Sequence, residues 1–63
     1  MERYEITENN FIRDIRVDVI VGYIEERDGV FTAFGNNGGR VQKVGTWKRR
    51  ASILPAFYRW QGW

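Results

Sequence analysis

The chain contains no cysteine and no histidine among its 63 residues. The missing cysteines exclude disulfides, and the two absences together remove the usual ligands of zinc, copper and haem, so we expect no cofactor. A chain of this length buries only about 60% of its unfolded surface, which leaves little stability without such cross-links. Ten aromatic residues, each able to bury about 150–250 Å², must supply the core, or a partner chain must complete it.

Long apolar runs are missing as well. Runs such as Val19–Val21 are far shorter than the roughly 20 residues that a membrane-spanning helix needs. Residues 1–8 have neither the basic start nor the apolar stretch of a signal peptide. We therefore expect one small β domain over residues 1–63, in the cytoplasm and without a membrane partner.

Acidic residues are absent after Asp28. Residues 1–28 hold all eight acids and four arginines, whereas residues 29–63 hold the other six basic residues and no acid. This asymmetry predicts an anionic partner for the C-terminal part of the chain. The alternative is intramolecular, because acidic and basic strands that lie side by side in a small fold neutralise each other.

Sheet-forming residues dominate the centre of the chain. β-branched and aromatic side chains fill residues 15–24 and 30–34, and the polar segment 26–29 separates them. The pattern predicts a long β-hairpin over Ile15–Phe34.

Two registers are open at the turn of this hairpin. A two-residue loop centred on Asp28 and Gly29 places Tyr23 opposite Phe34, whereas a three-residue loop places Phe34 over Gly22.

Alternation along residues 15–24 predicts which face of the strand is buried. The opposite face begins with Arg16 and Asp18 and becomes apolar from Ile20 to Ile24, toward the turn. Such a change is typical of a sheet that curls over itself, with Gly22 as a bend or bulge point. The face predicted to be buried throughout consists of Ile15, Val17, Val19, Val21 and Tyr23.

Turn signals divide the rest of the chain. Residues 4–7 are predicted to form a first strand, and residues 35–39 a turn in which Gly38 has a positive φ. Residues 40–47 then form an edge strand, protected by its lysine. The single proline, Pro55, excludes a central strand, so residues 57–60 are expected to form a closing strand or a helical turn.

These elements predict an all-β domain of four to five antiparallel strands. A small SH3-like or OB-like barrel, or a strongly curled sheet, is the favoured fold, and an open meander that dimerises through an exposed strand is the alternative. Residues 54–58, Leu-Pro-Ala-Phe-Tyr, resemble the proline-x-x-tyrosine segment of SH3 domains. This resemblance implies an SH3-like barrel.

Basic and aromatic residues gather in the acid-free part of the chain. Cations neutralise phosphates and flat rings stack on bases, so the combination is typical of nucleic-acid-binding surfaces. We therefore predict non-catalytic binding of nucleic acid through this part of the chain. The predicted binding residues are Arg40, Lys43, Trp47, Lys48, Arg49, Arg50, Tyr58, Arg59 and Trp60, and the same pattern includes Trp63.

A different class of function stays open. Tyr, Trp and Arg are also enriched at the energetic centres of protein interfaces. The rival prediction is a small protein-binding inhibitor or adaptor, of the kind that mobile elements encode, which docks on a host protein and forms a possible homodimer. An enzyme is not expected, because the chain lacks His and Cys, and its carboxylates have no recognisable catalytic spacing.

Overall fold

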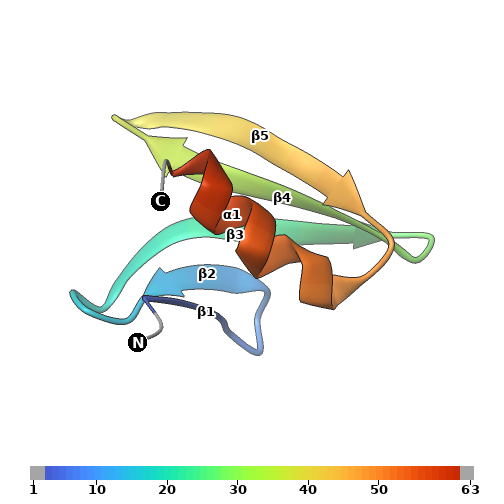
Figure 1. The fold of residues 1–63 in the computed structure, drawn as a ribbon, viewed down its shortest axis with the longest axis horizontal. Coiled ribbons are helices and arrows are strands. Elements are labelled where there is room, and N and C mark those ends of the chain that lie inside the picture. Colours follow the sequence, from blue (N-terminus) through green and yellow to red (C-terminus); the bar gives the residue numbers. More distant parts are fainter. Residues whose placement is uncertain (1–2, 62–63) are drawn as a thin grey trace.

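The structure, a computed structural model, describes residues 3–61 as an antiparallel sheet followed by a short helical segment. The five strands lie in the sheet in the order in which they occur in the chain (Figure 1). In chain order, the elements are β1 (Tyr4–Ile6), β2 (Phe11–Asp14), β3 (Val19–Arg27), β4 (Val30–Asn37), β5 (Arg40–Trp47), the 3-10 helix η1 (Arg50–Ser52) and the helix α1 (Ile53–Trp60).

The long central hairpin is confirmed as β3–β4. Asp28 and Gly29 form its two-residue loop, with φ angles of 54° and 76°, and the flanking strands place Tyr23 opposite Phe34. This is the first of the two predicted registers. The second turn is also confirmed, since Gly38 has a φ of 63°, and β5 lies at the edge of the sheet as expected.

Residues 15–18 form a turn and not the start of the long predicted strand. The Asp14 side chain accepts a hydrogen bond from the Arg16 main-chain N–H at 3.0 Å, and the Asp18 N–H donates to the Asp14 carbonyl oxygen at 2.8 Å. Asp18 takes a positive φ of 55°, which aspartate tolerates better than most residues. These local bonds override the β-propensity of the segment.

The buried face of β3 is the opposite of the predicted one. Gly22 and Ile24 are buried, and Ile24 belongs to the hydrophobic core. Ile12 of β2 pairs with Gly22, and Val21 is the extra residue of a bulge between the two strands, which shifts the alternation along β3. Three members of the predicted buried face are at least 38% exposed: Ile15, Val17 and Val19.

The C-terminal segment Ile53–Trp60 forms the helix α1. The predicted closing strand is therefore wrong, and the predicted alternative, a helical turn, is right. Pro55 lies in the first turn of α1, where the main-chain N–H groups have no partner within the helix and a missing N–H costs little. Ile53 and Phe57 are four residues apart, lie on one helix face and are fully buried. The segment compared with SH3 domains is therefore helical here.

A pair of glycines provides the surface on which α1 packs. Gly22 and Gly35 are directly paired across β3 and β4. A Cβ on Gly35 would collide with the Trp60 ring, and a Cβ on Gly22 would lie 3.3 Å from the Phe57 ring. The absence of two side chains thus lets the aromatic face of the helix reach the backbone of the sheet.

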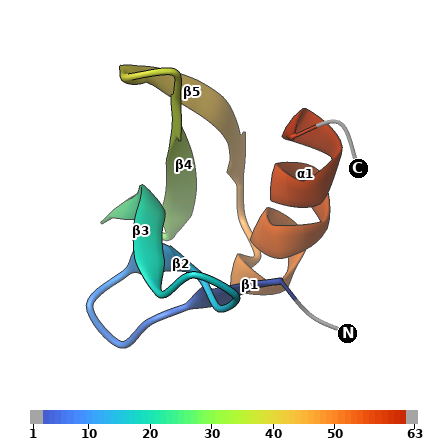
Figure 2. The same cartoon turned by 90° about the vertical axis from the view of Figure 1, so that its left-hand side faces the viewer.

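The sheet is open, and the predicted barrel or strongly curled sheet is wrong. β1 and β5 form its two edges and do not pair with each other. α1 contacts both of these strands and covers one side of the sheet (Figure 2). The main-chain N–H groups of Arg3 and Tyr4 both donate to the Tyr58 hydroxyl, at 2.9 and 3.0 Å, so the helix holds the short first strand in place. The helix supplies the second layer that a barrel would form from its own strands.

We expect Gly35→Ala to destabilise the protein by about 1–3 kcal/mol, because the new methyl group and the Trp60 ring cannot occupy the same space. Urea unfolding of Gly35→Ala, of Trp60→Ala and of the double variant measures this coupling. The substitution at residue 35 should cost clearly less when Trp60 is already alanine. An equal cost in both backgrounds would show that the helix does not rest on this glycine.

Candidate binding surfaces

The three aromatic residues of the predicted nucleic-acid surface take part in core packing. Trp47, Tyr58 and Trp60 are half-buried and pack against the core. The ring of Trp60 lies 5.3 Å from that of Phe57, and the ring of Tyr58 lies 5.1 Å from that of Tyr4. These rings therefore stabilise the fold. The predicted Trp63 lies outside the described residues.

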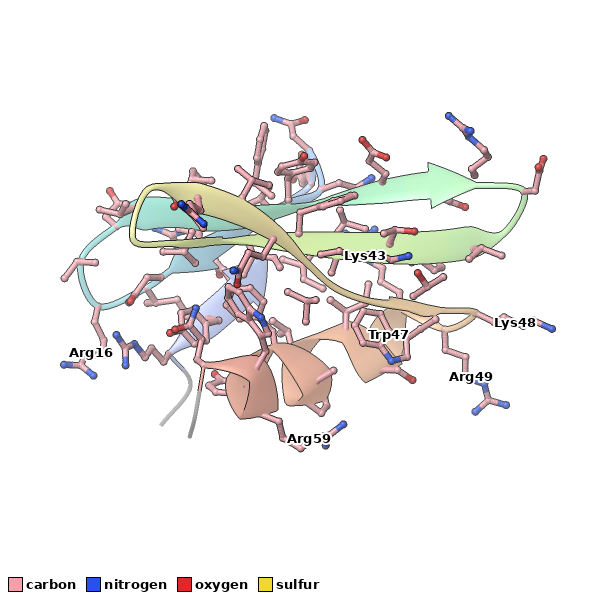
Figure 3. All side chains as sticks on the ribbon, turned by 90° about the horizontal axis from the view of Figure 1, so that it is seen from above. Arg16, Lys43, Trp47, Lys48, Arg49 and Arg59 are labelled. Carbon is pink, nitrogen blue, oxygen red and sulfur yellow. The ribbon has the colours of Figure 1, made fainter. Side chains whose placement is uncertain are left out.

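The predicted cations lie on several sides of the molecule. Arg40 and Lys43 are on β5, and Lys48 and Arg49 follow it and point outward at one end (Figure 3). Arg59 points away from the sheet on α1. These five residues are exposed. The structure thus places four of the six predicted cations on or directly after β5, which we call the β5 side, and does not gather the full set.

Arg50 has a structural role. Its guanidinium donates to the Asn10 side-chain oxygen at 2.7 Å and to the Thr7 carbonyl oxygen at 3.3 Å. These bonds connect η1 to the turn between β1 and β2.

Among the described residues, no ion pair connects the acidic N-terminal part of the chain to its basic C-terminal part. Within residues 3–61 the ion pairs are Arg3 with Asp14, Arg13 with Glu5 and Arg13 with Asp18, all inside the N-terminal third. The expected neutralisation between acidic and basic strands is not found there. The positive charge of the β5 side is therefore available to a partner.

The side of the sheet that faces away from α1 carries a cluster of apolar side chains that no described element covers. We call its apolar residues the outer patch. In the part of the chain that the structure describes, no helix or strand covers this face (Figure 2). The patch consists of Phe11, Ile20, Tyr23, Phe34 and Val41; Phe11, Ile20 and Val41 are 42%, 48% and 61% exposed.

Cross-strand pairing builds the centre of this patch. Phe11 pairs with Tyr23, Tyr23 with Phe34, and Phe34 with Lys43, in one row across β2 to β5. The Tyr23 and Phe34 rings are stacked, with centroids 4.9 Å apart. Beside them runs an apolar groove of about 150 Å³, bordered by Phe11, Ile20 and Val41 among others. An exposed apolar surface with a central aromatic pair can bind another apolar surface.

The sequence contained a signal for this patch. A two-residue loop at each of the two hairpins fixes the register of three strands, and the first loop alone places Tyr23 opposite Phe34. The sequence-based prediction assigned binding to the aromatic residues near the cations, and it assigned the central strand to the core. The bulge at Val21, which exposes Ile20, is what propensity and alternation did not reveal.

Other classes of site find little support among the described residues. Residues 3–61 contain no group of three or more acidic side chains placed to hold a metal ion. The one helix there is too short to cross a membrane. Comparisons with protein-family models, curated proteins and solved structures each find no match.

Asp14 is the one buried carboxylate among the described residues. Its burial acts to raise its pKa, but hydrogen bonds from the Arg3 side chain and the Arg16 main chain, with the charges of both arginines, outweigh burial and lower the pKa. A carboxylate with a lowered pKa stabilises the fold above its unfolded pKa of about 3.9, and this contribution is lost as the pH falls through the folded value.

We therefore expect the difference in melting temperature between the wild type and Asp14→Asn to be largest near neutral pH and to shrink as the pH falls below about 4. Thermal unfolding of both proteins across the acid range measures it. Exposed Asp28→Asn is the control and should show no such convergence. A constant difference down to the acid limit would exclude the ionised Asp14 as a stabilising group.

Proposed function

We propose that the protein is a non-catalytic binding module that docks on another protein through the outer patch. The observation that carries the proposal is the apolar row across β2, β3 and β4, which α1 leaves uncovered. Monomeric soluble proteins rarely leave an apolar row and groove of this kind without a partner. Within residues 3–61 the core is small, with six buried hydrophobic residues. An uncovered row of similar composition is therefore a large part of the apolar surface of these residues.

The geometry of the central rings favours a protein partner over stacked bases. Tyr23 and Phe34 are stacked with an angle of 20° between their planes, so each covers one face of the other. Each ring therefore keeps only one face on which a base could stack, whereas an apolar side chain of a protein can also pack on the ring edges. The groove beside the rings is lined mainly by apolar residues.

The surroundings of the patch resemble the rim of a protein interface. Lys43 borders it on β5, and Arg13, which is paired with Glu5 and Asp18, borders it on β2. An apolar centre with a charged rim of both signs is the usual arrangement at such interfaces. A chain of this size with one such surface suits an inhibitor or adaptor that acts by occupying a site on a larger protein.

We expect Ile20→Thr and Val41→Thr each to weaken binding of the partner about 10-fold while leaving the melting temperature nearly unchanged, because both side chains are half-exposed or more. Val17→Thr is the matched control, since Val17 is 63% exposed and lies outside the patch. The partner is first captured from extracts of the source cells after nuclease treatment, then purified for calorimetry. Equal affinities for all three variants would exclude the patch as the docking surface.

Nucleic-acid binding is a second candidate, favoured by the unpaired cations of the β5 side. Lys48 and Arg49 are exposed, project from one end of the molecule (Figure 3) and form no ion pair within residues 3–61. In this form, binding depends on phosphate contacts and not on the predicted tryptophans.

For this candidate, the logarithm of affinity for single-stranded DNA should fall linearly with the logarithm of salt concentration. Lys48→Ala and Arg49→Ala should each flatten the slope by about 0.7, the value for one phosphate contact. Fluorescence anisotropy measures both quantities, with Arg16→Ala at the opposite end of the molecule as control. Wild-type protein that shows no binding at low salt would remove this candidate.

A further inference from the structure

The side chains in the first half of β5 are exposed to solvent on both faces of the sheet. Arg40, Val41, Gln42 and Lys43 are all exposed, although successive residues of a strand point to opposite sides of the sheet. β5 also pairs with β4 alone, and it forms the border of the sheet (Figure 1). This half-strand is therefore open above, below and along its edge. Such an edge is a template for one more strand.

The turn before β5 determines which main-chain groups are available. Residues 38–39 form a two-residue loop, and the residue after such a loop directs its N–H and C=O toward the partner strand. The direction of these groups alternates along an antiparallel strand. Arg40 and Gln42 therefore direct theirs toward β4, whereas Val41 and Lys43 direct theirs away from the sheet.

The charge of this edge determines which strand it accepts. Arg40 and Lys43 form no ion pair within residues 3–61, and Lys48 and Arg49 extend the positive charge beyond the end of β5. A second copy of β5 at this edge would bring two groups of cations together, which is unfavourable. Lysine at an edge thus opposes self-association, but it favours a strand that carries acidic side chains.

We propose that the free edge of β5 binds an extended acidic segment of a partner protein as an additional strand of the sheet. The outward main-chain groups of Val41 and Lys43 would hydrogen-bond to the main chain of this segment. Arg40 and Lys43, which lie on opposite sides of the strand, would each pair with an acidic side chain on their own side. This site does not depend on the outer patch, although Val41 borders both surfaces.

The test uses a fluorescent peptide, equal in length to β5, in which glutamate and valine alternate in pairs (Glu-Glu-Val-Val), so that glutamates lie on both sides of the strand. Its binding to the wild-type protein is measured by fluorescence anisotropy. The same peptide with lysine in place of glutamate should bind at least about 10-fold more weakly, because its charges repel those of the edge. Val41→Pro should weaken binding of the acidic peptide about 10-fold, since it removes an outward N–H donor without removing a bond to β4. Val41→Thr changes the same side chain but keeps the donor, so the difference between the two variants isolates the contribution of the N–H group.

Two further arms separate strand addition from simple attraction between charges. A version of the acidic peptide that is N-methylated at alternate residues keeps its charge but loses main-chain donors, and it should bind about 10-fold more weakly to the wild-type protein, whatever the stability of Val41→Pro. Oligothymidylate should not displace the acidic peptide. Equal binding of the methylated and unmethylated peptides, or displacement by oligothymidylate, would overturn the proposal, and the latter result would favour nucleic acid as the anionic partner.

Discussion

Two aromatic rings that rest on two glycines hold this fold together. Phe57 and Trp60 of α1 lie against the backbone at the directly paired Gly22 and Gly35, so the helix reaches the centre of the longest hairpin. From there it extends to both edges of the sheet, and the Tyr58 hydroxyl accepts two main-chain hydrogen bonds from the first strand. A domain without disulfides or metal ligands thus obtains its second layer from a single helix of eight residues.

In that arrangement α1 covers one face of the sheet except at the first half of β5. No described helix or strand covers the other face. The large apolar side chains of α1 belong to the core or pack against it on the helix side: Leu54, Phe57, Tyr58 and Trp60. The outer patch is therefore a consequence of how the core is built, and a second helix would be needed to cover it. Charged residues are divided in a similar way. Asp14 and Glu5 form ion pairs with arginines of the N-terminal part, whereas the cations along and after β5 form no ion pair within residues 3–61.

Local signals predicted local structure well. The turns at Asp28-Gly29 and Gly38, and the edge strand that follows, come from residues whose backbone preferences act over a few positions. The predictions that failed depended on packing between elements that lie farther apart in the sequence. The reading of Pro55 as excluding a central strand left a closing strand and a helical turn both open, although the four-residue spacing of Ile53 and Phe57 favours the helix. The inversion of the β3 faces results from one bulge. The candidate surface changed with it, because the rings assigned to binding pack against the core, and Tyr23, which was assigned to the buried face, lies in the outer patch.

The central claim is that the helix protects one face of the sheet and leaves the other accessible. Because the chain has no cysteine, single cysteines report accessibility without interference. Cysteine at Ile20 or Val41 on the outer face should react with a maleimide at nearly the rate of a free thiol, whereas cysteine at Ala33, fully buried on the helix side, should react only as fast as the protein opens. Equal protection at residues 20 and 33 would contradict the account, because it would mean that both faces are covered.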